Sequence, residues 1–393
     1  MHFDLSAEQT LLQESASRFL TDTYDIAART AAIGTPRGYS SDMWRRFADF
    51  GWLGLPLSED VGGFGGGAID VMILMECLGG ALVVEPYLGA IVLAGRLLDR
   101  TGSPAQRQRV LPDLIRGEKT LALAHAEPQA RYDLASVRTT AVTDGDTFCI
   151  NGTKTMVLNG AADALLVLAR CHGAENDPAG LSLFLVDASE RISVHAYRTV
   201  DGMRAADLVF DDVVVDGSAL VGDLGQAFAA VDEAVTFASL AVAAESVGVM
   251  EAANRTTIDY LKMREQFSVK LATFQALQHR VVDMTMAAEL ARSLVIAAAI
   301  KMHEQAMDRT RAVAAAKYEC GKAGRFIGKN AVQLHGGMGM SHDYIVGHYL
   351  KRLLTTDMLF GDQIHQCKRY ERLSDSRLSS EAKRSGMDAA KIP

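Results

Sequence analysis

Five cysteines are the residues of this chain best suited to metal binding or redox chemistry. They are odd in number and scattered, and no two of them form a CxxC pair: Cys77, Cys149, Cys171, Cys320 and Cys367. Zinc sites and disulfide frameworks need cysteines at close, regular spacing. We therefore expect no metal site and no disulfides, and we expect reduced thiols in the cytoplasm.

A glycine-rich run from Gly62 to Gly67 is a second place where chemistry could be expected. Such runs hold phosphates where they join a strand to a helix in a βαβ unit. No strand pattern precedes this run, so its spacing gives it no phosphate-binding role. We expect an ordinary loop there.

Composition narrows the class of protein. The 393 residues are 49% apolar and 22% charged, which predicts two or three globular domains with a large core. The net charge of −8 disfavours binding to nucleic acid, whose phosphates repel an acidic surface. The N-terminus lacks the basic and apolar segments of a signal peptide. The most apolar stretch, Gly80 to Gly95, is interrupted by Glu85 and Pro86, so we expect no membrane span.

Residues 1–118 have the pattern of a helical domain. Ser6 and Gln9 predict a capping box at the first helix. Ser41 is expected to cap a short helix that ends at Gly51. Ser103, followed by a proline, predicts the start of another helix that ends at Gly117. The side chains expected to face inward from the short helix are Trp44, Phe47 and Phe50.

From residue 119 to residue 224 the pattern changes to short β-rich runs between turn residues. Asp144-Gly145 predicts a hairpin, and Asn151-Gly152 and Asn159-Gly160 mark further turns. This pattern favours a compact β-barrel or sandwich. The predicted strands are 121–126, 137–143, 147–150, 164–169 and 181–186.

Helical periodicity returns from residue 225 to residue 373. Four long helices, near 226–264, 272–306, 309–335 and 342–370, predict a four-helix bundle. Residues 374–393 are polar, and we expect a loose tail. The order is therefore helical domain, β-domain and helical bundle, an α+β arrangement. Rossmann and TIM folds are excluded because they alternate strands with helices.

Five segments, in this order and at this spacing, resemble the acyl-CoA dehydrogenase family. The resemblance covers residues 4–373 and implies that family's fold: an N-terminal helical domain, a central β-barrel and a C-terminal four-helix bundle. More closely, the chain is similar to the small subunit of pimeloyl-CoA dehydrogenase and to related two-gene dehydrogenases for dicarboxylic or steroid-derived acyl-CoA thioesters. The segments are LALAHAEP at 121–128, INGTK at 150–154 followed by Asn159-Gly160, REQF at 264–267, FQALQH at 274–279 and QLHGGMG at 333–339.

The resemblance implies a reaction in which a carboxylate takes the α proton of an acyl-CoA while FAD accepts a hydride from the β carbon. In much of the family the base is a Glu in the segment that matches 357–362, where this chain carries Phe360. A second family solution places the Glu at a position that we align with Ala238. Both positions therefore lack a base. Glu245 and Asp362 are weak alternative bases, each with a competing interpretation as a structural carboxylate.

The resemblance also implies an FAD site shared between subunits, of which this chain retains one half. On the barrel side, the usual hydroxyl and small residues are replaced by Ala126, the run 129–132, Met156 and Leu158. On the bundle side, an arginine suits a pyrophosphate and glycines let the backbone approach phosphates. We expect His335 to be a packed or surface histidine and not a cofactor-binding residue. The cofactor-binding residues implied by the resemblance are Arg264, Phe267, Gln275, Gln333, Leu334, Gly336 and Gly337.

This asymmetric loss predicts a base-lacking subunit that completes the FAD site of a catalytic acyl-CoA dehydrogenase subunit in an α2β2 heterotetramer. The implied partners are that subunit, an acyl-CoA substrate and an electron-transfer flavoprotein as electron acceptor. Two alternatives remain open. The chain could be a self-sufficient homomeric dehydrogenase with a relocated base, or a non-catalytic binding module with the same fold. Neither the composition nor the motifs select the acyl chain of the substrate.

Overall fold

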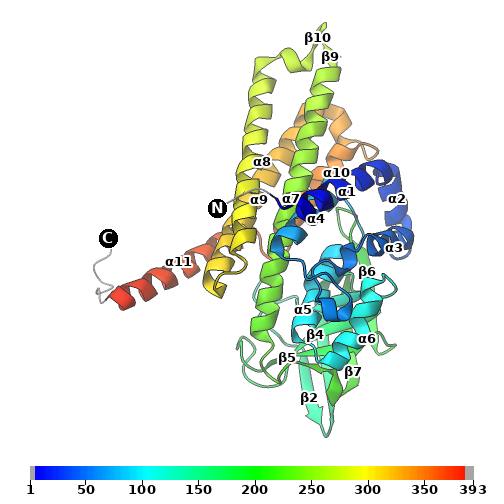
Figure 1. Cartoon of the computed structure of the whole chain (residues 1–393), viewed down its shortest axis with the longest axis vertical. Coiled ribbons are helices and arrows are strands. Elements are labelled where there is room, and N and C mark those ends of the chain that lie inside the picture. The colour runs from blue at the N-terminus through cyan, green and yellow to red at the C-terminus, as the bar shows by residue number, and fades with distance from the viewer. Residues whose placement is uncertain (1–4, 386–393) are drawn as a thin grey trace. The chain divides into compact units, whose positions relative to one another are not determined.

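A computed structural model describes residues 5–385 of the chain, with side chains described as far as Asp375. The chain divides into two compact units, Met1–Ala241 and Val242–Pro393. The boundary falls inside one long helix, α7 (Phe228–Met263), coloured green in Figure 1. Each unit is therefore described by itself.

Short helices make up the N-terminal part of the first unit. The predicted capping box of Ser6 and Gln9 is confirmed, as is the helix start at Ser103. Gly117 follows the last of these helices with φ +70°, which suits a glycine just past a helix end. The helices are α1 (Ala7–Thr23), α2 (Ile26–Gly34), α3 (Ser41–Asp49), α4 (Ala68–Gly80), a π-helical segment (Tyr87–Gly95), α5 (Arg96–Thr101) and α6 (Pro104–Ile115).

Two predictions about α3 were wrong. Ser40, not Ser41, caps it, because the Ser40 hydroxyl accepts the N–H of Met43 at 3.2 Å. Phe50 is 50% exposed, whereas Trp44 and Phe47 are buried as predicted. Phe50 lies just beyond the last helical residue, so the helical period does not set its direction.

The middle of the first unit is the predicted all-β domain. Its eight strands form one mixed sheet in the order β6-β7-β3-β2-β4-β5-β8, with β1 pairing in parallel with β4. Three of the strands, β6, β7 and β8, were not predicted. The strands are β1 (Leu121–Ala124), β2 (Thr140–Asp144), β3 (Thr147–Leu158), β4 (Ala164–Arg170), β5 (Leu181–Asp187), β6 (Ile192–Arg198), β7 (Arg204–Asp216) and β8 (Leu220–Val221).

The turn predictions in this domain had mixed outcomes. The hairpin at Asp144-Gly145 is confirmed, since Asp144 pairs with Thr147 across it. Asn151-Gly152 is not a turn. It lies inside β3, where the pairing with β7 shifts register beside Gly152 at φ +147°. This is the signature of a β-bulge, which a glycine accommodates without a side-chain clash.

The second unit consists of long helices, joined at one end by a short hairpin. This hairpin, β9 (Glu265–Gln266) and β10 (Val269–Lys270), connects α7 to α8 (Gln275–Lys301), as Figure 1 shows. The next helix is α9 (Ala306–His335). The predicted fourth helix is two helices, α10 (Ile345–Met358) and α11 (Gln363–Ser385), so that expectation was wrong. The expectation of a loose tail from residue 374 was also wrong as far as residue 385, because α11 continues to Ser385. Residues 386–393 lie outside the described part.

Helix α7 is long and apolar enough to cross a membrane by length and composition. However, 94% of its most apolar window is buried inside the protein. A helix that is apolar on all sides and buried is the core helix of a large domain. Its apolar character is therefore explained by packing.

Candidate functional site

The break between α10 and α11 contains the position that aligns with the family's usual base. Phe360 occupies it with φ +58°, in the left-handed region that a bulky residue rarely adopts. Buried Lys317 of α9 donates to the carbonyl oxygens of Asp357 at 2.8 Å and Gly361 at 3.2 Å. The Gln366 amide donates to the Phe360 carbonyl oxygen at 2.9 Å. Donors from α9 and α11 thus hold the turn, yet the phenyl ring of Phe360 cannot accept a proton.

The charged groups around this turn are already engaged in hydrogen bonds or an ion pair. Burial lowers the pKa of Lys317 to about 8, which leaves it mostly protonated at neutral pH. The Asp357 carboxylate accepts from the Arg325 guanidinium at 2.7 Å. Asp362 accepts the N–H of His365 at 2.9 Å and thereby caps α11. Its geometry supports the structural interpretation of Asp362 over a catalytic one.

Glu245 is held by a buried ion pair. The Arg352 guanidinium on α10 donates to both of its carboxylate oxygens, at 2.6 and 2.7 Å. Their side chains are 5% and 4% exposed, respectively. A fork of this kind stabilises the ionised carboxylate and fixes its direction. Ala238, the other aligned base position, offers only a buried methyl group.

The expected phosphate-binding residues lie at one end of the second unit. Arg264 directly follows α7, is exposed and donates its backbone N–H to the Tyr260 carbonyl oxygen at 2.8 Å. Phe267 is 86% exposed at the tip of the β9–β10 hairpin. Phe267 and Ser268 both have positive φ, +56° and +64°, as a two-residue hairpin turn requires. Gln275, also exposed, begins α8 just after this hairpin.

The end of α9 supplies the other expected residues. Gln333, Gly336 and Gly337 are exposed, and a Cβ at either glycine would meet nothing within 4 Å. Leu334 is 7% exposed, so only its backbone could reach a ligand. His335 is 3% exposed, and its ring packs on Tyr260 at a centroid distance of 4.3 Å. This contact brings the end of α9 beside the end of α7. Of the two expected placements of His335, packed or at the surface, the structure shows the packed one.

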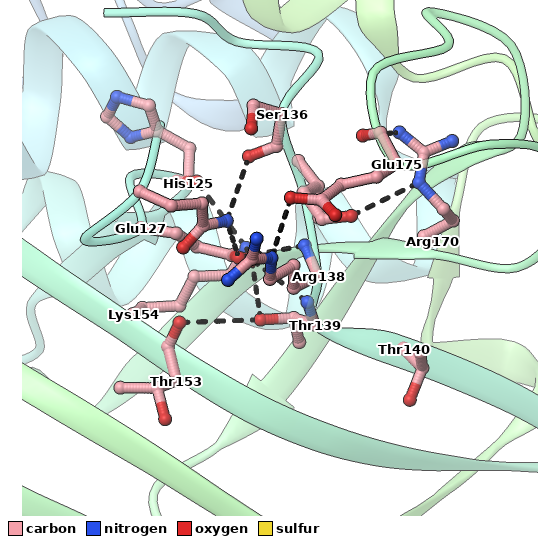
Figure 2. Close-up of polar contacts among 12 residues, drawn as sticks. His125, Glu127, Ser136, Arg138, Thr139, Thr140, Thr153, Lys154, Arg170 and Glu175 are labelled. Atoms are coloured by element: carbon pink, nitrogen blue, oxygen red, sulfur yellow. Dashed lines mark hydrogen bonds and ion pairs between the residues drawn. The ribbon is translucent and has the colours of Figure 1, made fainter. Parts of the chain in front are cut away.

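In the first unit, Glu127 is the centre of a buried polar cluster in the segment that follows β1 (Figure 2). Its carboxylate accepts from the Lys154 ammonium at 2.7 Å, and both side chains are almost fully buried. It also accepts from the Thr139 hydroxyl at 2.7 Å, from the backbone N–H groups of Thr139 and Arg138, and from the Gln129 amide. These bonds fix the segment after β1 against β3.

The ionisation of this cluster follows from its contacts. The Lys154 ammonium and the donors around it outweigh burial and lower the pKa of Glu127 to about 2. Burial lowers the pKa of Lys154 to about 8, so both partners are charged at neutral pH. Burial and the charge of Lys154 lower the pKa of His125 to about 4, which keeps its imidazole neutral. Glu127 and Lys154 lie in family-like segments, LALAHAEP and INGTK, but no role was predicted for them.

Hydrogen bonds fix the backbone at two of the expected cofactor-ring positions, Ala126 and Met156. Ala126 accepts the N–H of Thr155 at 2.9 Å through its carbonyl oxygen. Asp207 accepts the Met156 N–H at 3.1 Å and the Thr155 hydroxyl at 2.7 Å, which holds Met156 at φ +51°. The side chain of Met156 is 40% exposed. At this face, therefore, apolar side chains stand where the resemblance implies hydroxyl groups.

The residues of the second unit fit a dinucleotide phosphate. An exposed guanidinium and two exposed glycines with open space beside them are what a pyrophosphate needs. No three His, Cys, Asp or Glu side chains within the described residues are placed to hold a metal ion. All five cysteines lie in the described part of the chain, and none is in a disulfide.

Comparison with known proteins agrees with this architecture. Three models of one family match almost the whole chain: "Acyl-CoA dehydrogenase, N-terminal domain" at residues 6–118, "middle domain" at 122–213 and "C-terminal domain" at 225–372. A curated relative, caffeyl-CoA reductase-Etf complex subunit CarC of Acetobacterium woodii, is 31% identical over 78% of this chain and 83% of its own length.

Solved structures are similar over nearly the full length. The ChsE4-ChsE5 complex from Mycobacterium tuberculosis has a chain with a TM-score of 0.85 and 26% identity, which covers 95% of this chain and 98% of that one. The FAD complex of PigA has a TM-score of 0.88 and 25% identity, over 96% of this chain and 100% of that chain. The cofactor of this fold is FAD, which accepts a hydride when it is bound. This chain belongs to the acyl-CoA dehydrogenase family.

Proposed function

We propose that this chain is the base-lacking subunit of a heteromeric, FAD-dependent acyl-CoA dehydrogenase, an α2β2 heterotetramer in which a second subunit carries the catalytic base. The observation that carries this proposal is the turn between α10 and α11. That turn is rigidly held, and it presents the phenyl ring of Phe360 where the family places a carboxylate. Dehydrogenation needs a base beside the α carbon, so a partner must supply it.

The two alternative carboxylates in this chain are already engaged. Moving Glu245 to a substrate would break a buried, two-bond ion pair with Arg352. Such a break leaves an uncompensated buried charge and costs about 3–5 kcal/mol. Moving Asp362 would remove the cap of α11, at about 1 kcal/mol. These contacts weigh against a self-sufficient homomeric enzyme with a relocated base.

In the proposed complex, this chain donates Arg264, Phe267, Gln333 and Gly337 to FAD seated on the β-domain of its partner. Their exposure at one end of the second unit supports this role. The similarity to a chain of the ChsE4-ChsE5 complex supports a second subunit. The similarity to a subunit of a caffeyl-CoA reductase-Etf complex supports an electron-transfer flavoprotein as electron acceptor. A reducing compartment, the cytoplasm, suits five cysteines without a disulfide.

The test compares the chain purified alone with the chain co-expressed with the acyl-CoA dehydrogenase subunit encoded beside it. Alone, it should show no stoichiometric flavin absorbance and no oxidation of any acyl-CoA in a thioester panel. Co-purified, the pair should hold one FAD per heterodimer and oxidise an acyl-CoA. Stoichiometric flavin together with activity in the isolated chain would overturn the proposal. Absence of activity in the co-purified pair would favour a non-catalytic binding module.

Variants of the complex sharpen this test. Arg264→Ala should lower FAD retention, whereas Arg18→Ala, at an exposed position on α1, should not. Glu245→Gln and Asp362→Asn should leave turnover of the folded complex unchanged within about twofold, since neither residue is the base. Loss of turnover with FAD retained in either variant would instead identify a relocated base.

A further inference from the structure

The ring of His335 joins the two segments that we expect to bind the cofactor. It stacks on Tyr260 at a centroid distance of 4.3 Å and an interplanar angle of 30°. On Tyr344 it packs at 5.3 Å and 52°. Tyr260 lies four residues before Arg264 in the last turn of α7, and its carbonyl oxygen accepts the Arg264 N–H. His335 is the last residue of α9, directly before Gly336.

The nitrogens of this ring show how it acts. Nδ1 lies 2.8 Å from the Ala331 carbonyl oxygen, which only accepts, so Nδ1 carries the proton. Nε2 is buried and has no hydrogen-bond partner. Burial also lowers the pKa of His335, which favours the neutral ring. Because one nitrogen is used only within its own helix and the other is unused, the faces of the ring make the contacts between elements.

The backbone after His335 turns back towards the end of α9. Gly336 adopts φ +60° and ψ −138°, a conformation open to glycine. Gly339 then folds back, so that a Cβ there would lie 3.2 Å from the Cβ of His335 and 2.7 Å from the Val332 carbonyl oxygen. The exposed Gly336-Gly337 backbone therefore lies between buried His335 and the contact that Gly339 makes with the end of α9.

We propose that His335 is the positioning residue that holds residues 264–267 and residues 336–337 in one arrangement, through its ring faces. This inference rests on the proposed cofactor role of those two segments. Its physical basis is the stack Tyr260–His335–Tyr344, since aromatic pairs at these separations and tilts attract beyond simple area burial. It predicts that a ring is required at position 335, while a titratable nitrogen is not.

The first test needs no cofactor. Amide hydrogen exchange of the full chain is compared for the parent, His335→Ala and His335→Phe. The control is His303→Ala, at an exposed histidine in the turn between α8 and α9. His335→Ala should speed exchange about tenfold or more in both 264–270 and 336–342. His335→Phe and His303→Ala should leave both segments at the parent rate. Unchanged exchange at 264–270 in His335→Ala would overturn the inference.

The second test measures FAD affinity in the complex with the catalytic subunit. The FAD dissociation constant should rise about tenfold for His335→Ala and recover in His335→Phe. If His335→Ala does not fold, Tyr344→Leu removes one face of the stack and should show the same paired effect. If the complex does not form, the proposed function fails while the exchange experiment still decides the role of His335. Equal affinity in parent and His335→Ala, or no recovery with phenylalanine, would refute it.

Discussion

Replacing Glu127 by glutamine should destabilise the β-domain far more than the same substitution at an exposed ion pair. Glu127→Gln leaves the Lys154 ammonium, whose side chain is 0% exposed, without a charge partner. It also turns an amide NH2 towards groups that donate, such as the N–H of Thr139 at 3.0 Å. Breaking one side of a buried ion pair costs about 3–5 kcal/mol, which is a large part of the stability of a typical domain.

Glu175→Gln is the matched control, because Glu175 accepts from Arg138 at 2.6 Å but the two side chains are 41% and 64% exposed. Exposed pairs contribute about 0–1 kcal/mol. The assay is amide hydrogen exchange in β1 and β3, which reports opening of the sheet without assuming that the whole chain unfolds in one step. If Glu127→Gln lowers the free energy of opening of the sheet by no more than Glu175→Gln does, burial does not determine the strength of this ion pair and the prediction is refuted.

The pH dependence of the same variant provides an independent check. The pKa of Glu127 is lowered from 4.5 to about 2 in the folded protein, so its ionisation contributes stability that is present above 4.5. That contribution is lost as the pH falls towards 2. The stability difference between parent and Glu127→Gln should therefore shrink over this window. A difference that stays constant down to pH 2 would contradict the assignment.

Three further predictions concern the second unit. Arg352→Met should lower the free energy of unfolding in urea by about 3–5 kcal/mol, because it leaves the buried Glu245 carboxylate without its charge partner. Adding Glu245→Leu should recover most of that loss. Equal stability of the Arg352→Met variant and the parent would refute this prediction. The pKa of Lys317 is lowered from 10.5 to about 8, so the unfolded chain binds more protons between these values and stability should rise with pH there. Lys317→Met should flatten that rise, and an unchanged slope would contradict it. Exposed Cys367 should be the first cysteine to react with a neutral thiol reagent, and Cys320, which is 2% exposed, should be the last. Peptide mass spectrometry measures the order of labelling. The reverse order would refute this assignment of exposure.

Local signals were the most reliable part of the sequence. The capping box of Ser6 and Gln9 and the hairpin at Asp144-Gly145 involve residues three apart or fewer, so tertiary context changed neither. Asn151-Gly152 carries an equally strong turn signal but lies within β3. There, pairing with β2 on one side and β7 on the other overrides the local preference.

The other failures have equally physical reasons. Strand β6 was missed because it carries only a weak apolar signal. Nearly all of it is exposed, and of its alternating apolar residues, Ile192, Val194 and Ala196, only Ile192 is buried. The break at Phe360 was missed because helical periodicity continues through it. The donors that hold this turn open, Lys317 and Gln366, come from α9 and α11, and no window around residue 360 contains the first of them.

The sequence by itself determined the order of the domains, the family, and the lack of a carboxylate at positions 238 and 360. The order of the domains follows from the period of apolar residues. The family, and the positions at which a carboxylate would stand, follow from the resemblance of five segments to that family. Only the tertiary structure decided which of the remaining acids are available for chemistry. The partner of Glu245 lies 107 residues away and that of Glu127 lies 27 residues away. An ion pair depends on distance in space between two side chains, and that distance exists only once the helices and strands have packed.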